Sequence, residues 1–350
     1  MASWSLCMIV KNEEETLGRC LDSVSELFEQ IVITDTGSED ATKEIARSYG
    51  CEVWEYEWGD DFAAARNFAF SKACGDYIMW LDADDVLPER SRRRLLEEKQ
   101  RPPGAFDVLM LPYHTGFDES GRVTFAYERE RVVRRCPEAV WQGRVHEVIA
   151  PFGRVEHVDA PVEHRKMRPS APGRNLRIYE RMLHEGAKLG ARELYYYARE
   201  LMYNGRYEDG ARAFEEFLQR EDGWAENRLD AYRQLSSCRR ALGDEEGAVR
   251  PLLSALREGP PRPELCCDLG RYFFDKGEWQ AASFWYKGAL MAERGDGGFE
   301  DVDCRGYVPC IQLCCCFWQL GDMIRAQYWN ERAGKYKPDS PAYLHNKTLF

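Results

Sequence analysis

The stretch Tyr77-Ile78-Met79-Trp80-Leu81-Asp82-Ala83-Asp84-Asp85 joins an apolar run directly to three carboxylates. The apolar part is typical of a buried strand. Carboxylates gathered at the end of such a strand repel one another and cost free energy to desolvate, unless a cation or a donor-rich ligand shares the site. Because Mg²⁺ and Mn²⁺ take oxygen ligands and bridge to phosphates, an Asp-x-Asp pair here suits a nucleotide diphosphate. A solvated acidic turn is the alternative that this stretch alone leaves open.

Around this stretch, short β-rich segments alternate with segments of helical periodicity up to about residue 165. We expect strands at 5–10, 30–34, 52–56 and 77–81, and helices at 17–24, 41–49 and 63–73. Strands joined through helices in this order form a parallel sheet with right-handed crossovers, and ligands bind beyond the carboxyl ends of its strands. The polar turns after the predicted strands therefore lie at one edge of the sheet, together with the acidic cluster.

The chain after about residue 172 is helical in pattern and contains an internal period. Gly243 and Gly277 lie 34 residues apart, and a pair of alanines repeats the same spacing. The next interval, from Gly277 to Gly321, is 44 residues, which fits one repeat with a ten-residue insertion near 293–298. This spacing matches tetratricopeptide repeats, which stack into curved arrays. A weaker first unit has Gly210 where the later units have alanine.

Composition narrows the class of protein. With 350 residues, of which 44% are hydrophobic and 13% aromatic, the chain can bury a large core and is expected to form two domains. A net charge of −12 argues against a nucleic-acid partner. Because the sequence shows neither a signal-peptide pattern nor a long apolar run, we expect a cytoplasmic protein without a membrane span. The 13 cysteines are then expected to be buried, reduced thiols.

Four motifs occur in a fixed order within the first 85 residues: 5–14, 33–42, 65–67 and 81–85. They resemble the ordered motifs of family 2 glycosyltransferases with the GT-A fold. The later segments 143–147 and 162–164 are similar to the branch of that family whose acceptor-side motif reads Val-His-Glu. The resemblance covers roughly the first 185 residues. In layout the chain is similar to members with C-terminal repeats, including the sublancin-type peptide S-glycosyltransferases.

The resemblance implies which residues bind the nucleotide sugar. They are Val10, Asn12, Glu13, Asp35, Thr36, Arg66, Asp82 and Ala83. The carboxylate of Asp35 can accept hydrogen bonds from a base or ribose. Many members of the family have a second aspartate where this chain has Thr36, so the identity of the base stays open. Arg66 would donate to a carboxylate or diphosphate, and a structural ion pair with an acidic turn is the alternative.

The resemblance also implies a metal site and a base. It assigns Asp84 to an Mn²⁺ or Mg²⁺ ion, with His164 as a further candidate that an ordinary structural histidine would explain equally well. Transfer with inversion needs a base that takes the acceptor's proton. Glu147 is favoured as this base over His146, for which a packed, hydrogen-bonded imidazole is the alternative.

Together, these arguments predict an α/β GT-A domain (Rossmann-like) followed by an all-α tetratricopeptide-repeat solenoid. We expect the glycosyltransferase domain over 1–170, a linking helix over 171–190 and the repeats over 191–350. The expected activity is metal-dependent, inverting transfer from a nucleotide-diphospho sugar, with a UDP-sugar favoured, to a peptide or protein acceptor held by the repeats. Transfer to a saccharide or lipopolysaccharide core is one alternative. An inactive transferase domain on a protein-binding repeat scaffold is another alternative. For the repeats themselves, the alternative to holding the acceptor is to form a homodimer. A nucleotidyltransferase lacks support because no phosphate-cradling Gly-rich loop with its lysine is present.

Overall fold

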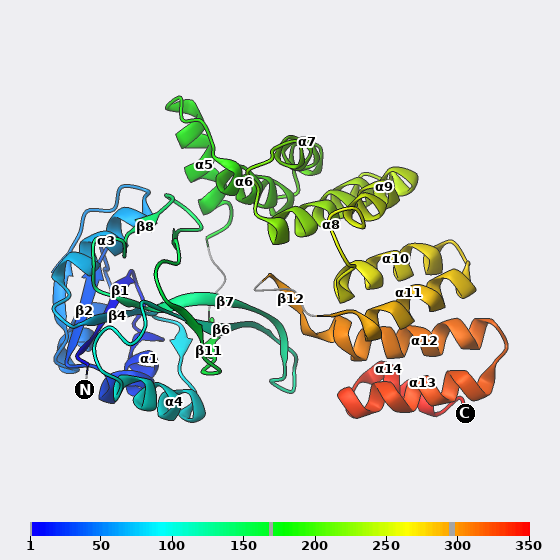
Figure 1. The fold of residues 1–350 in the computed structure, drawn as a ribbon, viewed down its shortest axis with the longest axis horizontal. Coiled ribbons are helices and arrows are strands. Elements are labelled where there is room, and N and C mark those ends of the chain that lie inside the picture. Colours follow the sequence, from blue (N-terminus) through cyan, green and yellow to red (C-terminus); the bar gives the residue numbers. More distant parts are fainter. Residues whose placement is uncertain (1, 168–170, 294–297) are drawn as a thin grey trace. The chain divides into compact units, whose positions relative to one another are not determined.

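The computed structural model describes residues 2–167, 171–293 and 298–350, which form two compact units (Figure 1). The first unit, Met1–Ala187, is built around a twisted sheet, and the second, Lys188–Phe350, is almost entirely helical. The predicted fold class, an α/β GT-A domain followed by a helical repeat domain, is therefore confirmed.

Four parallel strands form one half of the sheet, in the order β3-β2-β1-β4. They are β1 (Trp4–Val10), β2 (Gln30–Asp35), β3 (Glu52–Glu55) and β4 (Tyr77–Trp80). The intervening helices are α1 (Leu17–Val24), α2 (Thr42–Ser48) and α3 (Phe62–Lys72). Val10 pairs with Asp35, so the carboxyl ends of β1 and β2 are level with each other. The predicted strand–helix order and parallel pairing are confirmed in this half.

The other half of the sheet is mixed, which the sequence pattern does not predict. Its strands are β5 (Asp85–Val86), β6 (Val108–Phe117), β7 (Val123–Arg134), β10 (Val155–His157) and β11 (Val162–His164). β7 runs antiparallel to both β4 and β6, and β11 runs parallel to β6. β5 pairs with β11 so that Asp85 lies opposite His164. This register brings the acidic cluster and a distant histidine together.

Helices cover both faces of the sheet and enclose two hydrophobic cores. Alternate residues of β1 point to opposite faces. Leu6 and Met8 pack with α1 and with α4 (Glu89–Lys99), whereas Cys7 packs with α3. A small hairpin of β8 (Trp141–Gln142) and β9 (Val148–Ile149) adds Trp141 to the second core. The strand ends are thus held between two packed layers.

The helix α5 (Arg174–His184) also belongs to the first unit. Its Arg181 contacts Asp60 at 2.8 Å, and Glu185, just beyond its end, contacts Arg144 at 2.9 Å. The segment that contains Arg144 leads directly into His146 and Glu147. The helix therefore braces the loops that follow β3 and β8.

The second unit consists of antiparallel helix pairs, which Figure 1 shows side by side for α8/α9, α10/α11 and α12/α13. Its helices are α6 (Ala191–Tyr203), α7 (Tyr207–Leu218), α8 (Ala225–Ala241), α9 (Glu245–Ala255), α10 (Pro263–Asp275), α11 (Trp279–Met291), α12 (Tyr307–Gln319), α13 (Met323–Tyr336) and α14 (Pro341–Lys347). A short strand, β12 (Glu300–Asp301), and a 3₁₀ helix, η2 (Val302–Arg305), precede α12. Of the predicted insertion, residues 294–297 lie outside the described residues.

The predicted repeat register is confirmed by one glycine in each pair. Gly205, Gly243, Gly277 and Gly321 each connect the first helix of a pair to the second, with φ between 75° and 80°. This left-handed conformation is available to glycine without the steric penalty of a side chain. The alanines at the repeat positions of α9, α11 and α13 are all buried, which lets paired helices approach closely.

All 13 cysteines lie in the described residues and are free thiols. Cys310, Cys314 and Cys316 are buried in α12, where they pack among the repeat helices. Within the described residues, none of the helices combines the length and apolar character that crossing a membrane requires.

Candidate active site

The three carboxylates after β4 have different surroundings. Asp82 and Asp84 line a cavity of 820 Å³ at the carboxyl edge of the sheet. Asp85 turns away from this cavity and is completely buried. Its Oδ2 accepts a hydrogen bond from the Asp82 backbone N–H at 3.0 Å, which closes the turn. One carboxylate therefore builds the turn, and the other two remain available to a ligand.

The charge of Asp85 is balanced by Arg131 on β7. The two side chains form an ion pair at 3.0 Å, and the same guanidinium donates to the Trp80 carbonyl at 3.3 Å. Tyr113 donates its hydroxyl proton to Asp85 Oδ1 at 2.8 Å. Burying a charge is tolerated when it is paired and hydrogen-bonded in this way. Sequence reasoning assigned no role to Arg131 or Tyr113.

His164 lies at the mouth of the same cluster. Its Nδ1 is 3.2 Å from an oxygen of Asp84 and 3.2 Å from an oxygen of Asp85. Burial by itself lowers the pKa of His164, but these two carboxylates outweigh burial and raise the pKa to about 10. The two carboxylates therefore favour the protonated imidazole, which would bind a metal ion only after releasing that proton.

Arg66 on α3 connects two predicted site residues that are 65 positions apart in the sequence. Its Nη2 donates to Asp82 and its Nε donates to Glu147, both at 2.7 Å. The guanidinium also lies 4.8 Å from the ring centre of Trp80 and 4.9 Å from that of Trp141. Because the arginine is clamped by two rings and two carboxylates, it holds Asp82 and Glu147 in a fixed relation.

These contacts keep Asp82 ionised. Burial raises the pKa of Asp82, but the opposing charges of Arg66 and Arg131 hold it well below its usual range. The nearby Glu13 differs, because burial raises its pKa and the charges of Asp84 and Asp82 add to that rise. Of the carboxylates that line the cavity, Asp82 is thus firmly charged, whereas Glu13 is held less strongly in its charged form.

Most of the residues predicted to bind the nucleotide sugar meet at this cavity. Val10, Asn12, Glu13, Thr36, Arg66, Asp82 and Ala83 all line it. Asp35 does not: its Oδ1 accepts the backbone N–H groups of Gly37 and Ser38 at 3.0 and 2.9 Å, and its side chain is buried. A contact between Asp35 and the nucleoside stays a prediction, and its observed task is to shape the turn after β2.

The two candidate bases also line the cavity, on the loop between β8 and β9. Glu147 is largely buried and is bonded to Arg66. His146 has φ of 52°, a left-handed backbone conformation that is uncommon outside glycine, and its ring stacks on Tyr179 of α5. A strained residue held by its surroundings is frequent at functional sites. The structure thus places both candidates at one wall.

Several further residues of the cavity were missed by sequence reasoning. They are Lys11, Trp58, Phe62, Tyr113, Tyr127, Arg129, Lys166 and Arg174 among others. Arg129 lies 4.7 Å from the Trp80 ring centre and donates to the Glu147 carbonyl at 3.1 Å. The alternation of Arg129 and Arg131 along β7 was a possible signal. No comparable pattern marks Lys166 or Arg174, which reach the cavity through the fold alone.

The acidic cluster fits a divalent cation. Within the described parts of the chain, one ligand atom from each of Asp84, Asp85 and His164 lies within 4.8 Å of the others. Two carboxylates and an imidazole form a donor set that Mn²⁺ accepts readily, whereas Mg²⁺ prefers oxygen alone. Asp85 is fully buried and does not line the cavity, whereas Asp84 and His164 do, so these two are the side chains that an ion in the cavity would reach.

Comparisons with known proteins agree with this architecture. Residues 5–148 match the family model described as glycosyl transferase family 2. A TPR repeat-containing protein of Synechococcus elongatus is 38% identical over 150 residues, which are 43% of this chain and 36% of that protein. The SPbeta prophage-derived glycosyltransferase SunS of Bacillus subtilis is 26% identical over 212 residues, or 55% of this chain and 48% of that protein. The lipopolysaccharide core biosynthesis glycosyltransferase LpsC of Rhizobium meliloti is 30% identical over 159 residues, or 43% of this chain and 58% of that protein.

This chain therefore spans between 36% and 58% of the lengths of these relatives. The similarity to the family model lies entirely in the first unit.

Proposed function

We propose that this chain, whose residues 5–148 form a glycosyltransferase family 2 domain, transfers a sugar from a nucleotide-diphospho donor to a peptide or protein acceptor. The observation that carries the proposal is the meeting of Asp84 and His164 with the Arg66–Glu147 pair in one cavity. In this assignment, the donor site is formed by residues 1–170 together with the start of the linking segment 171–190, whose helix α5 belongs to the first unit, and residues 191–350 receive the acceptor.

The cavity has the size and chemistry that a nucleotide sugar requires. Its 820 Å³ falls within the range of about 300–1,000 Å³ that is common for small-molecule sites. Thr36 and Asn12 supply polar groups on one side, and Lys11 and Arg174 add positive charge at the wall. We assign the nucleoside to the ends of β1 and β2 and the diphosphate to the acidic cluster, with a UDP-sugar as the favoured donor.

Asp84 and His164 would hold a divalent cation, with Mn²⁺ preferred over Mg²⁺ because of the imidazole ligand. Such an ion neutralises the diphosphate and stabilises it as a leaving group. Asp82, which Arg66 keeps ionised and oriented, is placed to accept hydrogen bonds from the donor's ribose. Asp85 holds the turn that carries Asp82 and Asp84, and it does not touch the donor.

Transfer with inversion requires that an acceptor group lose its proton as it attacks the anomeric carbon. Glu147 is our candidate for the base, since its bond to Arg66 fixes one carboxylate oxygen in position. His146, stacked on Tyr179, is the competing candidate at the same wall.

A polypeptide acceptor is favoured by the repeat unit, because solenoids of this kind bind extended peptides and helices. A saccharide acceptor is the second candidate, supported by the 30% identity to a lipopolysaccharide core glycosyltransferase over 159 residues. A homodimer formed through the repeats is compatible with either acceptor.

A transfer assay separates these possibilities. The purified chain is incubated with Mn²⁺, a panel of nucleotide sugars, and either a peptide library or lipopolysaccharide-core oligosaccharides, and products are identified by mass. A peptide whose mass rises by one sugar supports the proposal, and a glycosylated oligosaccharide would replace the acceptor class. Absence of nucleotide release and of product with every donor would favour an inactive domain on a repeat scaffold.

A further inference from the structure

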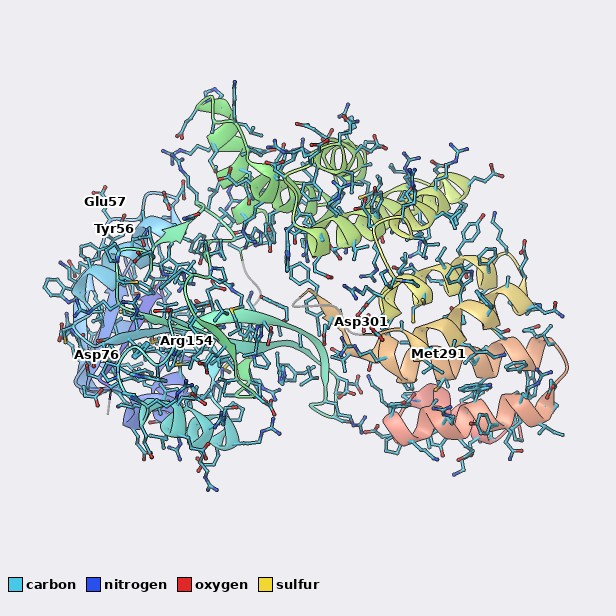
Figure 2. The ribbon with its side chains drawn as sticks, in the orientation of Figure 1. Tyr56, Glu57, Asp76, Arg154, Met291 and Asp301 are labelled. Carbon is cyan, nitrogen blue, oxygen red and sulfur yellow. The ribbon has the colours of Figure 1, made fainter. Side chains whose placement is uncertain are left out.

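Part of the insertion in the repeat unit lies across the first helices of three successive pairs. The insertion begins after Met291, the last residue of α11, and its described part leads through Asp301, both labelled in Figure 2. Within it, Gly298 contacts α8, Phe299 contacts α6 and Asp301 contacts α10. The connections between the preceding pairs, 219–224 and 256–262, are shorter than the 15 residues from 292 to 306. The excess chain is used to reach across neighbouring repeats.

The three contacts are of different types. Phe299 lies beneath Arg199 of α6, with the guanidinium carbon 4.3 Å from the ring centre. Gly298 packs so tightly against Glu226 of α8 that an added Cβ would lie 2.7 Å from its carboxylate. The backbone N–H of Asp301 donates to Glu264 of α10 at 3.1 Å. A ring, a close backbone approach and a backbone hydrogen bond are the contacts that an extended peptide makes in a groove.

The surface beneath this segment consists of Arg199, Glu226 and Glu264, and we call it the α6–α8–α10 face. The face is formed by the first helix of each of three pairs. First helices of successive pairs contact one another, as α6 does α8 and α10 does α12. Burial raises the pKa of Glu264 and also that of Asp301, while Arg233 of α8 opposes both rises. The face therefore offers a guanidinium to an aromatic ring and a carboxylate to a backbone N–H group, while Glu300 of the segment pairs with Arg305, which lies outside the face.

We propose that the α6–α8–α10 face is a binding surface for an extended polypeptide that places an aromatic ring against Arg199 and a backbone N–H group against Glu264, and that residues 298–301 of this chain occupy it. The chain's own segment then competes with any external polypeptide of the same chemistry. This goes beyond the proposed sugar transfer and does not depend on it, because it concerns binding alone.

The occupying segment is short, and the residues after it are anchored independently. Asp303 pairs with Lys337 at 2.6 Å, and Cys304 is buried in the core of the last repeats. Residues 298–301 can therefore leave the face while α12 stays in place. A segment tethered this closely has an effective concentration of about millimolar, so an external peptide must exceed that concentration or meet a weakened competitor.

Fluorescence anisotropy with a labelled peptide of residues 298–303, Gly-Phe-Glu-Asp-Val-Asp, tests the proposal on the full chain. Phe299→Ala weakens the internal competitor, and Phe284→Ala, a 68% exposed phenylalanine on α11, is the matched control. We expect Phe299→Ala to bind the peptide at least tenfold more tightly than the wild type, and Phe284→Ala to behave as the wild type. Adding Arg199→Ala to Phe299→Ala is expected to abolish this gain.

Equal peptide affinity of the wild type and a folded Phe299→Ala variant would overturn the proposal. Hydrogen exchange on the wild type gives a second readout that needs no variant. Excess peptide is expected to speed exchange of the Asp301 amide, because displacement breaks its bond to Glu264. An unchanged exchange rate at several millimolar peptide would overturn the proposal equally, even for a variant that failed to fold.

Discussion

The carboxylate of Asp85 and the guanidinium of Arg131 lie 3.0 Å apart, and neither side chain is exposed to solvent. The guanidinium is also enclosed by aromatic rings, 3.8 Å from the ring centre of Trp80 and 4.1 Å from that of Tyr113. This pair fixes the turn after β4 from the protein side. Asp84, only one residue earlier, faces the cavity instead. The acidic cluster thus divides into a structural carboxylate and a candidate ligand.

Asp85→Asn is expected to lower the free energy of unfolding by about 3–5 kcal/mol, because it leaves the buried charge of Arg131 without its partner. Urea unfolding followed by tryptophan fluorescence measures this change. Asp159→Asn is the matched control, since Asp159 also pairs with an arginine at 3.0 Å but is 80% exposed. An exposed pair contributes roughly 0–1 kcal/mol. Similar losses for the two variants would contradict the structural role of Asp85.

Arg66→Lys is expected to lower kcat/KM at least tenfold while the protein stays folded. A lysine has a single nitrogen and is unable to bridge Asp82 and Glu147 in the geometry of a planar guanidinium. Arg90→Lys, at a largely exposed arginine, is the control and should leave kcat/KM unchanged. Steady-state kinetics with the donor and acceptor found in the transfer assay provide the comparison. Wild-type kinetics for Arg66→Lys would show that the bridge is dispensable.

Glu147→Gln distinguishes the two candidate bases. The amide oxygen keeps the shape and the bond to Arg66 but does not accept a proton at neutral pH. We expect kcat to fall by about 10²–10⁴-fold, with nucleotide affinity unchanged, since general-base catalysis contributes about that much. His146→Gln, at the neighbouring position, is expected to have a smaller effect. A larger loss of kcat in His146→Gln would transfer the role of base to the histidine.

Replacing glycine by alanine is expected to have opposite effects on the stability of the helical unit at two positions of the repeats, Gly243 and Gly288. Gly243→Ala should destabilise the helical unit by about 1–2 kcal/mol, because Gly243 has φ of 80° and a side chain there is strained even in open space. Gly288→Ala, within α11 and with only an ordinary contact at 3.6 Å, should stabilise the unit by about 0.5–1 kcal/mol. Calorimetric melting temperatures should move in opposite directions. Equal shifts would mean that the left-handed glycine is not needed.

The parallel half of the sheet and the repeats could be predicted from the sequence because both have strong local signals. Each early strand is a short apolar run that ends in a polar turn, and the glycines of the repeats mark positions that need positive φ. The hairpin of β6 and β7 has no such signal. Its Glu130 and Arg131 are buried although they stand in a run of charged residues. Glu130 pairs with its neighbour Arg129, but the partner of Arg131 is Asp85, 46 positions away, so only the tertiary structure shows where the charge of Arg131 is balanced.

The same contrast applies to the candidate site. The acidic cluster that contains Asp84 could be singled out because carboxylates after a buried strand suggest chemistry, and Glu147 because of the resemblance to the family's Val-His-Glu motif. The link between Asp82 and Glu147 through Arg66 depends on the packing of α3 against the β8–β9 loop, which no local pattern encodes. Asp35 shows the opposite case, since its motif position suggested a ligand contact while its Oδ1 bonds the backbone of its own turn.

The central claim, a donor site built around Asp84, is tested most directly by calorimetric titration of UDP, GDP, TDP and CDP with and without Mn²⁺. The wild type, Asp84→Asn and the exposed control Asp159→Asn are compared, each after its fold is verified by circular dichroism. We expect one nucleotide, with UDP favoured, to bind the wild type and the control only when Mn²⁺ is present, and Asp84→Asn to lose this binding. Failure of the folded wild type to bind any of the four nucleotides, or undiminished Mn²⁺-dependent binding by Asp84→Asn, would contradict the account.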